Sequence, residues 1–270
     1  LQRLSSVIES LNYPVLLGMA EVENRDVLED LIAQENLQSA GYDIAHINSS
    51  DGRGIDCALL YRSEFFSVDK QYLVRASDPQ QRDPGREQLV VEGHWKNGAK
   101  TTIAVNHWPS RREGRSESES NRISAARNLF LALYDNHDLE SDHIIIMGDF
   151  NDEPSNISIR NTLQAGPMGE SDDFDFVNLS YPMFSQGKGS YNYRGNWNML
   201  DQIIVSQPFL DCSDGLCAEA ALIYENEDLM FRHPRYGLTP NRTAGGPNYY
   251  GGYSDHLPVY APIKLPIVMP

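Results

Sequence analysis

The chain has 270 residues, of which 40% are hydrophobic, and a formal net charge of −16. This length can bury a sizeable core, and because no segment resembles a linker we predict one domain over residues 1–270. The acidic charge argues against a stable nucleic-acid complex held by a basic face, but a local positive site or a divalent cation could still attract a phosphate substrate. No run approaches the roughly 20 apolar residues that a membrane-spanning helix needs.

Short apolar runs of strand length alternate with helical patterns along the chain. Apolar residues recur with helical spacing over 1–11 and 123–135, and Asn24 or Asp26 can cap a further helix. We predict strands, most of them rich in β-branched residues, at 14–20, 57–62, 101–108, 143–150, 200–206 and 257–263. Loops are predicted at 76–87, 109–120 and 232–253. The pattern indicates a mixed α and β fold.

The predicted strand at 143–150 ends in an unusual group of polar residues. Its apolar run stops at Gly148 and is followed closely by Asp149, Asn151 and Asp152. Turn chemistry explains such residues, because Gly, Asn and Asp favour chain reversal. Alternatively, Asp149 and Asn151 are two apart on an extended chain and point the same way from the strand end, where sites lie in layered α/β proteins.

Polar residues also stand at or beside the ends of the other predicted strands. Together with the pair above, they are Glu21, Asp56, His107, Asp149, Asn151, Asp201, Asp255 and His256. Carboxylate oxygens hold Mg²⁺, which neutralises charge on a phosphoester, and histidine has the pKa range for acid–base work. The set therefore suits phosphoester hydrolysis with Mg²⁺, or Mn²⁺, as cofactor.

Several of these residues belong to motifs that resemble a known family. AEVEN, GIDCALLYR, NHWPSR, GDFND, LDQIIVS and SDHLPV occur in the order and approximate spacing of the endonuclease/exonuclease/phosphatase superfamily, and the resemblance covers nearly the whole chain. It implies an α/β four-layer sandwich in which helices flank two packed, mostly antiparallel sheets. The family's first strand, which carries an Asn at the metal site, has no counterpart in this sequence. We therefore expect weakened metal binding by the chain as given, within a longer natural protein.

The resemblance also implies roles for the acidic and amide residues. By it, Glu21 is the principal metal ligand and Asp255 contributes to the metal site through water. Asp149 aligns or deprotonates the attacking water, and Asn151 holds the phosphate or the nucleophile. We interpret Glu23, in the same motif as Glu21, as a solvated neighbour.

The two histidines acquire carboxylate partners in the same way. The resemblance places His256 at the scissile phosphate with Asp201 as its partner, and His107 at the leaving group with Asp56 as its orienting acid. Considered residue by residue, alternatives stay open: His107 can be a core imidazole, Asp56 a strand-edge charge and Asp201 a turn cap.

The NHWPSR motif adds two candidates for substrate binding, Asn106 and Arg111. Arg111 and Arg112 can clamp a phosphate through paired hydrogen bonds, or they can lie in a solvated charged loop. The sequence does not choose between these alternatives.

The leading hypothesis is a divalent-metal-dependent phosphodiesterase or nuclease. A second is a phosphatase or phospholipase that acts on inositol phosphates or phospholipid headgroups, and a third is an inactive binding or scaffold protein. Cys212 and Cys217 are close enough in sequence to form a disulfide bond, which would favour an exported protein. Nothing else in the sequence indicates the compartment, and nothing indicates the oligomeric state.

Overall fold

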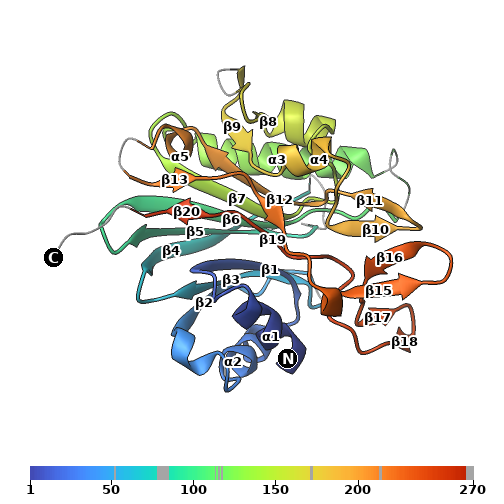
Figure 1. Cartoon of the computed structure of the whole chain (residues 1–270). Coiled ribbons are helices and arrows are strands. Elements are labelled where there is room, and N and C mark those ends of the chain that lie inside the picture. Colours follow the sequence, from blue (N-terminus) through green and yellow to red (C-terminus); the bar gives the residue numbers. More distant parts are fainter. Residues whose placement is uncertain are drawn as a thin grey trace.

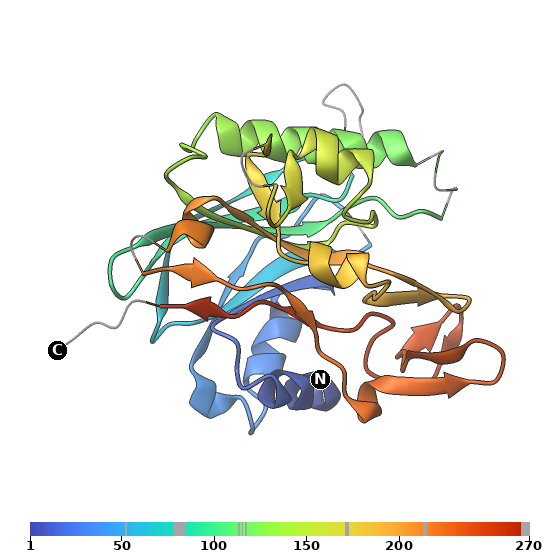
Figure 2. The same ribbon diagram turned by 45° about the horizontal axis from the view of Figure 1, so that its top comes forward.

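The chain folds into four layers, which run helix, sheet, sheet and helix (Figures 1 and 2). This computed structural model describes residues 1–51, 53–77, 85–112, 114, 116, 118–170, 173–212 and 215–265. The predicted α/β four-layer sandwich is confirmed. Each boundary between layers is filled by its own cluster of buried apolar side chains, as the two-sided burial of the strands requires.

The larger sheet has seven strands, in the order β4 (Phe66–Val74), β5 (Gln88–Trp95), β6 (Lys100–His107), β7 (His143–Asp149), β12 (Asp201–Ser206), β9 (Phe176–Asn178) and β8 (Ala165–Pro167). Neighbouring strands are antiparallel except for the pairs β6–β7 and β8–β9. Parallel strands need a crossover, and α3 (Glu119–Tyr134) supplies it between β6 and β7. Its buried Leu129 and Leu133 pack with Ile144 and Ile146 on the outer face of this sheet.

The smaller sheet has three strands, in the order β1 (Leu16–Val22), β3 (Asp56–Arg62) and β2 (Tyr42–His46). Its outer face is covered by α1 (Gln2–Ser10) and α2 (Arg25–Ile32) (Figure 1). The side chain of Asn24 accepts a hydrogen bond from the backbone N–H of Val27 at 3.0 Å, which confirms Asn24 as the cap of α2.

The two sheets pack face to face around the central core. In β3, Leu59 points into this core while Leu60 points outward to the helices, because successive side chains on a strand alternate faces. Ile145 and Ile146 divide in the same way on β7. Both faces of these strands are buried, which explains why their sequences are continuous apolar runs rather than alternating patterns.

The C-terminal segment forms short strands beside the smaller sheet. β19 (Val259–Tyr260) pairs with β14 (Leu222–Ile223), and β20 (Ile263–Lys264) pairs with β13 (Cys217–Ala218). A cavity of about 610 Å³ separates this segment from β1 and reaches Asp201 and His256. Leu16, Gly18 and Val259 are among its lining residues, so it lies along the outer edge of β1, the edge strand of its sheet.

The remaining elements are short. They are the 3-10 helices Gln38–Ala40 and Glu227–Leu229, the π-helix Ser158–Thr162, α4 (Tyr181–Ser185), α5 (Pro208–Asp211), and the hairpins β10 (Tyr191–Tyr193) with β11 (Asn196–Asn198), β15 (Met230–His233) with β16 (Gly237–Pro240), and β17 (Ala244–Gly245) with β18 (Asn248–Tyr249).

Several predicted boundaries need correction. The segment 232–253 is not simply a loop, because it holds the second half of β15 and all of β16 to β18. The predicted strand at 257–263 is split into β19 and β20, and β2, β4 and β5 were not predicted at all. Of the predicted loop at 76–87, residues 78–84 lie outside the described residues.

The described residues also show the pairing of the cysteines and the length of the helices. Cys212 and Cys217 form a disulfide bond, and Cys57 is a buried free thiol. Among the described segments, no helix is both long and apolar enough to cross a membrane.

Candidate active site

The register of the larger sheet brings three of the predicted site residues into one row. His107 lies opposite Asp149 across the β6–β7 pair, and Asp149 lies opposite Asp201 across the β7–β12 pair. Opposed residues on neighbouring strands lie about 5 Å apart and face the same side of a sheet. Three strand ends that are distant in sequence therefore present one imidazole and two carboxylates side by side.

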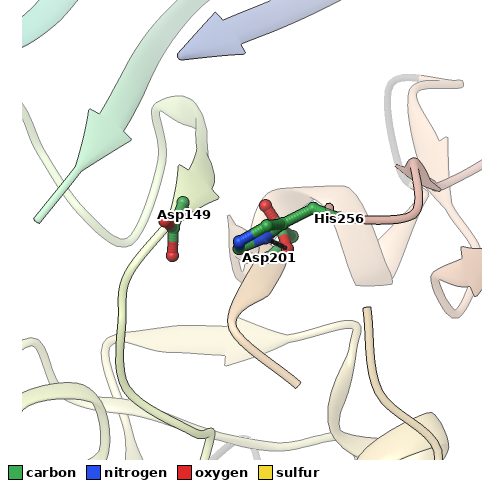
Figure 3. Close-up of side chains that lie close together, drawn as sticks. All are labelled: Asp149, Asp201 and His256. Carbon is green, nitrogen blue, oxygen red and sulfur yellow. Dashed lines mark hydrogen bonds and ion pairs between the residues drawn. The ribbon is translucent and has the colours of Figure 1, made fainter. Parts of the chain in front are cut away.

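His256 joins this row from the C-terminal segment. Its Nδ1 lies 2.6 Å from Asp201 Oδ2, which also accepts a hydrogen bond from Ser190 Oγ at 2.5 Å. Burial lowers the pKa of His256, but the charge and hydrogen bond of Asp201, with the charges of Asp149 and Asp255, outweigh it and raise the pKa to about 10. His256 is therefore an imidazolium at neutral pH, held by Asp201 beside Asp149 (Figure 3).

Asp149 and Asn151 form a compact turn that is also part of the site. The Asp149 carboxylate accepts hydrogen bonds from the backbone N–H of Asn151 at 2.8 Å and from its side-chain amide at 3.0 Å. Asn151 has a φ of 50°, a left-handed conformation that Asn tolerates better than most residues. Burial raises the pKa of Asp149 to about 7, against the positive charge of His256 and with the negative charge of Asp201.

Glu21 approaches from the smaller sheet, at a distortion in β1. The pairing of β1 with β3 is irregular between Met19 and Val22, and Glu21 has a φ of 58°. Such strained residues cluster at functional sites, where the fold holds them in place. The Glu21 side chain is 68% exposed, and its Oε1 lies 3.9 Å from His107 Nε2, which is itself 3.6 Å from Asp149 Oδ2.

The predicted pairing of Asp56 with His107 is wrong. The Asp56 carboxylate instead lies 3.0 Å from His46 Nε2 and accepts a hydrogen bond from Ser49 Oγ. Among the residues that the structure describes, Nδ1 of the buried His107 has no hydrogen-bond partner. Asp56 pairs with His46 because β2, a strand that was not predicted, places His46 opposite Ala58 and so within reach of the Asp56 carboxylate.

Arg86 is a site residue that sequence reasoning missed. Its Nη1 donates hydrogen bonds to His107 Nε2 and, at 2.7 Å, to the carbonyl oxygen of Trp108. Burial lowers the pKa of His107 well below 6.5, and the charges of Arg86 and His256 lower it further. His107 is therefore neutral, and because Nε2 accepts from Arg86 its proton resides on Nδ1. The only sequence signal for Arg86 was its place in a long loop.

Asn106 is wrongly predicted as a substrate contact. It is fully buried, its Nδ2 donates to the Met147 carbonyl oxygen at 3.2 Å, and its Oδ1 accepts from Trp108 Nε1 at 3.0 Å. Neighbouring residues on a strand point to opposite faces, so Asn106 cannot share the face of His107. The period of two within the strand was a signal that could have excluded it.

Arg111 supports the loop that carries Asn151. Its Nε donates to the Asn151 carbonyl oxygen at 2.5 Å, and its Nη2 lies 3.0 Å from Asp152 Oδ1. Asp152 is also paired, at 2.8 Å, with the fully buried Arg122 of α3. The structure thus gives Arg111 a structural role, and its contact with substrate stays a prediction.

The donor set of the site fits a hard divalent cation. Ligand atoms of Asp149, Asp201 and His256 lie within 4.8 Å of one another, although Asp201 and His256 also bind each other. Carboxylate oxygens are the ligands that Mg²⁺ and Mn²⁺ prefer. Asp255 is half-buried next to His256, and its role as a metal ligand stays a prediction.

Two packed sheets present carboxylates and a carboxylate-bound imidazole at converging strand ends, a donor set whose chemistry suits phosphoester hydrolysis. A family model, described as the endonuclease/exonuclease/phosphatase family, matches residues 1–265. The chain therefore belongs to the endonuclease/exonuclease/phosphatase family, as its motifs indicated.

Solved structures share this fold at low sequence identity. An endonuclease/exonuclease/phosphatase from Bacteroides vulgatus is 15% identical, with a TM-score of 0.64 over 97% of this chain and 89% of that one. A mannosyl-6-phosphatase from Bacteroides thetaiotaomicron is 16% identical, with a TM-score of 0.62 over 97% and 90%. ANGEL2, a 2′,3′-cyclic phosphatase, is 16% identical, with a TM-score of 0.66 over 98% and 85%. No curated protein matches the chain significantly.

Proposed function

We propose that this protein hydrolyses phosphodiester bonds with the help of Mg²⁺ or Mn²⁺. The observation that carries the proposal is the row of His107, Asp149 and Asp201, completed by the Asp201–His256 pair. The similar structures include enzymes described as acting on a cyclic phosphodiester and on a phosphomonoester, so both ester types belong in the test.

Glu21 and Asp149 are the proposed cation ligands, with Asp255 contributing through water. A bound divalent cation supplies charge neutralisation at the phosphate. Burial raises the pKa of Asp149 to about 7 in the metal-free protein, and a bound cation would lower it, so Asp149 would act as a carboxylate that aligns the attacking water or accepts its proton. His256 binds a phosphate oxygen as an imidazolium and donates its Nε2 proton toward it, because Asp201 occupies Nδ1. Asn151 is held beside Asp149 and orients that carboxylate.

The compartment is a separate proposal. The Cys212–Cys217 disulfide supports an oxidising location, such as the extracellular space or the periplasm.

The test is a panel of phosphodiesters and phosphomonoesters, assayed with Mg²⁺ and with Mn²⁺ on the wild type and on His256→Ala. We expect the substitution to lower turnover of the accepted substrate by at least about a hundredfold, the lower range for lost acid–base help. His94→Ala is the matched control, because His94 is a partly exposed histidine on β5 that pairs with Asp69. Equal rates for wild type and His256→Ala would remove His256 from the mechanism, and an inert wild type would favour the scaffold alternative.

A further inference from the structure

A second cavity, of about 320 Å³, adjoins the active site. The described residues that line it come from three loops and the start of α3, and they are Arg53, Ala76, Ser77, Gly85, Arg86, Pro109, Ser110, Arg112, Ser118 and Asn121. Three are arginines and, within the described part of the chain, none is acidic. A basic cavity is unexpected in a chain of net charge −16, and it indicates a site for an anionic group.

The arginines are held in different ways. Arg86 is half-buried, and both hydrogen bonds described for it leave through Nη1, so its Nε and Nη2 donors remain for a ligand. Burial lowers the pKa of Arg86 and the charge of Arg53 lowers it further, whereas the negative charges of Asp149, Glu21 and Asp51 act in the opposite direction. Arg112 is exposed at the cavity. Arg53 is paired with Asp51, so its charge is partly neutralised.

The N-terminus of α3 strengthens the positive character of the cavity. Ser118 occupies the N-cap position of this 16-residue helix, without a side-chain cap hydrogen bond, and Asn121 lies in the first turn, so the positive end of the helix dipole faces the lining. Glu119 in the same turn opposes this effect. The guanidinium groups of Arg86 and Arg112 therefore provide most of the attraction for an anion, and the helix end adds to it.

We propose that this cavity binds a second phosphate group of the substrate, next to the phosphate that is cleaved. Arg86 connects the two positions, because it lines the cavity and also hydrogen-bonds His107 in the catalytic row. Guanidinium groups bind phosphate through two parallel hydrogen bonds, a geometry that lysine cannot match. The substrate is accordingly a phosphoester with two phosphates, either a small bisphosphate or a nucleotide chain with a neighbouring phosphate. This inference rests on the proposed function.

The test compares substrates that differ by one phosphate. One pair is a sugar monophosphate and the corresponding bisphosphate, and the other is a dinucleoside monophosphate with and without a terminal phosphate. We expect wild type to prefer the two-phosphate member of one pair, which identifies the source of the second phosphate. Arg112→Ala should reduce kcat/KM for that member by about tenfold or more, as for a lost charge-assisted hydrogen bond, and leave the one-phosphate member unchanged.

Arg127→Ala is the matched control, because Arg127 is an exposed arginine of α3 that does not line the cavity. It should retain the preference of the wild type. Hydrolysis of the one-phosphate esters without any preference for a second phosphate, or an equal loss on both members in Arg112→Ala, would overturn the subsite and leave the proposed function standing.

If wild type hydrolyses neither pair, the cavity is tested by binding alone, and the proposed function itself fails only if the wild type is also inert on the whole panel of esters. Inorganic pyrophosphate is then titrated by calorimetry without divalent cations. A loss of affinity of about tenfold in Arg112→Ala, with wild-type affinity in Arg127→Ala, would support an anion site. An unchanged affinity in Arg112→Ala would overturn it.

Discussion

The charge on His256 depends on one neighbour, Asp201. Their hydrogen bond of 2.6 Å and the negative charge of Asp201 raise the pKa of a buried imidazole that burial alone would lower. The pKa of the neighbouring His107 shifts in the opposite direction, because burial and the charge of Arg86 lower it and so keep this imidazole neutral. Two histidines in one site thus hold different protonation states, which suits one to donate a proton and the other to accept a hydrogen bond.

Asp201→Asn tests this assignment at the scale of the residue. We expect the pKa of His256 to fall from about 10 by about 2 units or more, because the amide carries no charge and burial remains. NMR titration of the imidazole nitrogens in metal-free protein measures it, and an unchanged pKa would contradict the role of Asp201.

The same shift affects stability. Because the pKa of His256 is raised from 6.5 to about 10 in the folded state, its protonation stabilises the fold. This contribution is fully present below pH 6.5 and is lost as the pH rises toward 10. Urea denaturation at both pH values should therefore show a smaller decline in the free energy of unfolding for Asp201→Asn than for wild type.

At the scale of the element, the end of β7 decides where Asp149 lies. Gly148 has a φ of 132°, and a Cβ on it would clash with the carbonyl oxygen of Asn106 on β6. The close approach of these two backbones keeps Asp149 in register with His107. The glycine of the GDFND motif is thus required by the packing of two parallel strands. The same motif therefore forms the turn at the end of β7 and supplies Asp149 to the site.

Gly148→Ala should destabilise the protein by at least about 2 kcal/mol, because it combines a strained φ with a backbone clash. It should also reduce hydrolysis, because relief of the clash displaces Asp149. Gly98→Ala is the control, since Gly98 has a φ of 88° but no atom within 4 Å of the position that an alanine methyl group would take. This control should lose only about 1–2 kcal/mol, the cost of the backbone conformation. Equal losses in urea denaturation would show that the contact with Asn106 is unimportant.

At the scale of the whole molecule, the site exists only where the layers meet. Glu21 comes from the smaller sheet, Asp149 and Asp201 come from the larger one, and His256 comes from the C-terminal segment. These acids carry repulsive charge in a chain whose net charge is already −16. A divalent cation relieves that repulsion, so the fold and the cation should stabilise each other.

Addition of Mg²⁺ or Mn²⁺ should therefore raise the melting temperature, and chelation should reverse the effect. At a concentration 100 times the Kd, the expected gain is about 2.7 kcal/mol. Glu21→Gln should reduce the gain, whereas Glu64→Gln, at a glutamate whose side chain is 71% exposed, should not. Calorimetry measures the shift, and an equal gain in Glu21→Gln would exclude Glu21 as a ligand.

The sequence by itself determined the fold class, the family and most members of the site. Apolar runs bounded by Gly, Asn and Asp identify β3, β6, β7 and β12, because a strand that is buried on both faces has a continuous apolar run in its own sequence. The GDFND and SDHLPV motifs identify Asp149, Asn151 and His256 for a similar reason, since the residues of each motif are neighbours in the chain.

Only the tertiary structure decided the partnerships between distant residues. Asp56 binds His46 rather than His107, Arg86 contacts His107, and Asn106 faces the core. Each of these outcomes depends on strand register or on loop packing between segments far apart in the chain. A sequence pattern records whether a residue is buried and what chemistry it carries, but not which distant side chain lies opposite it.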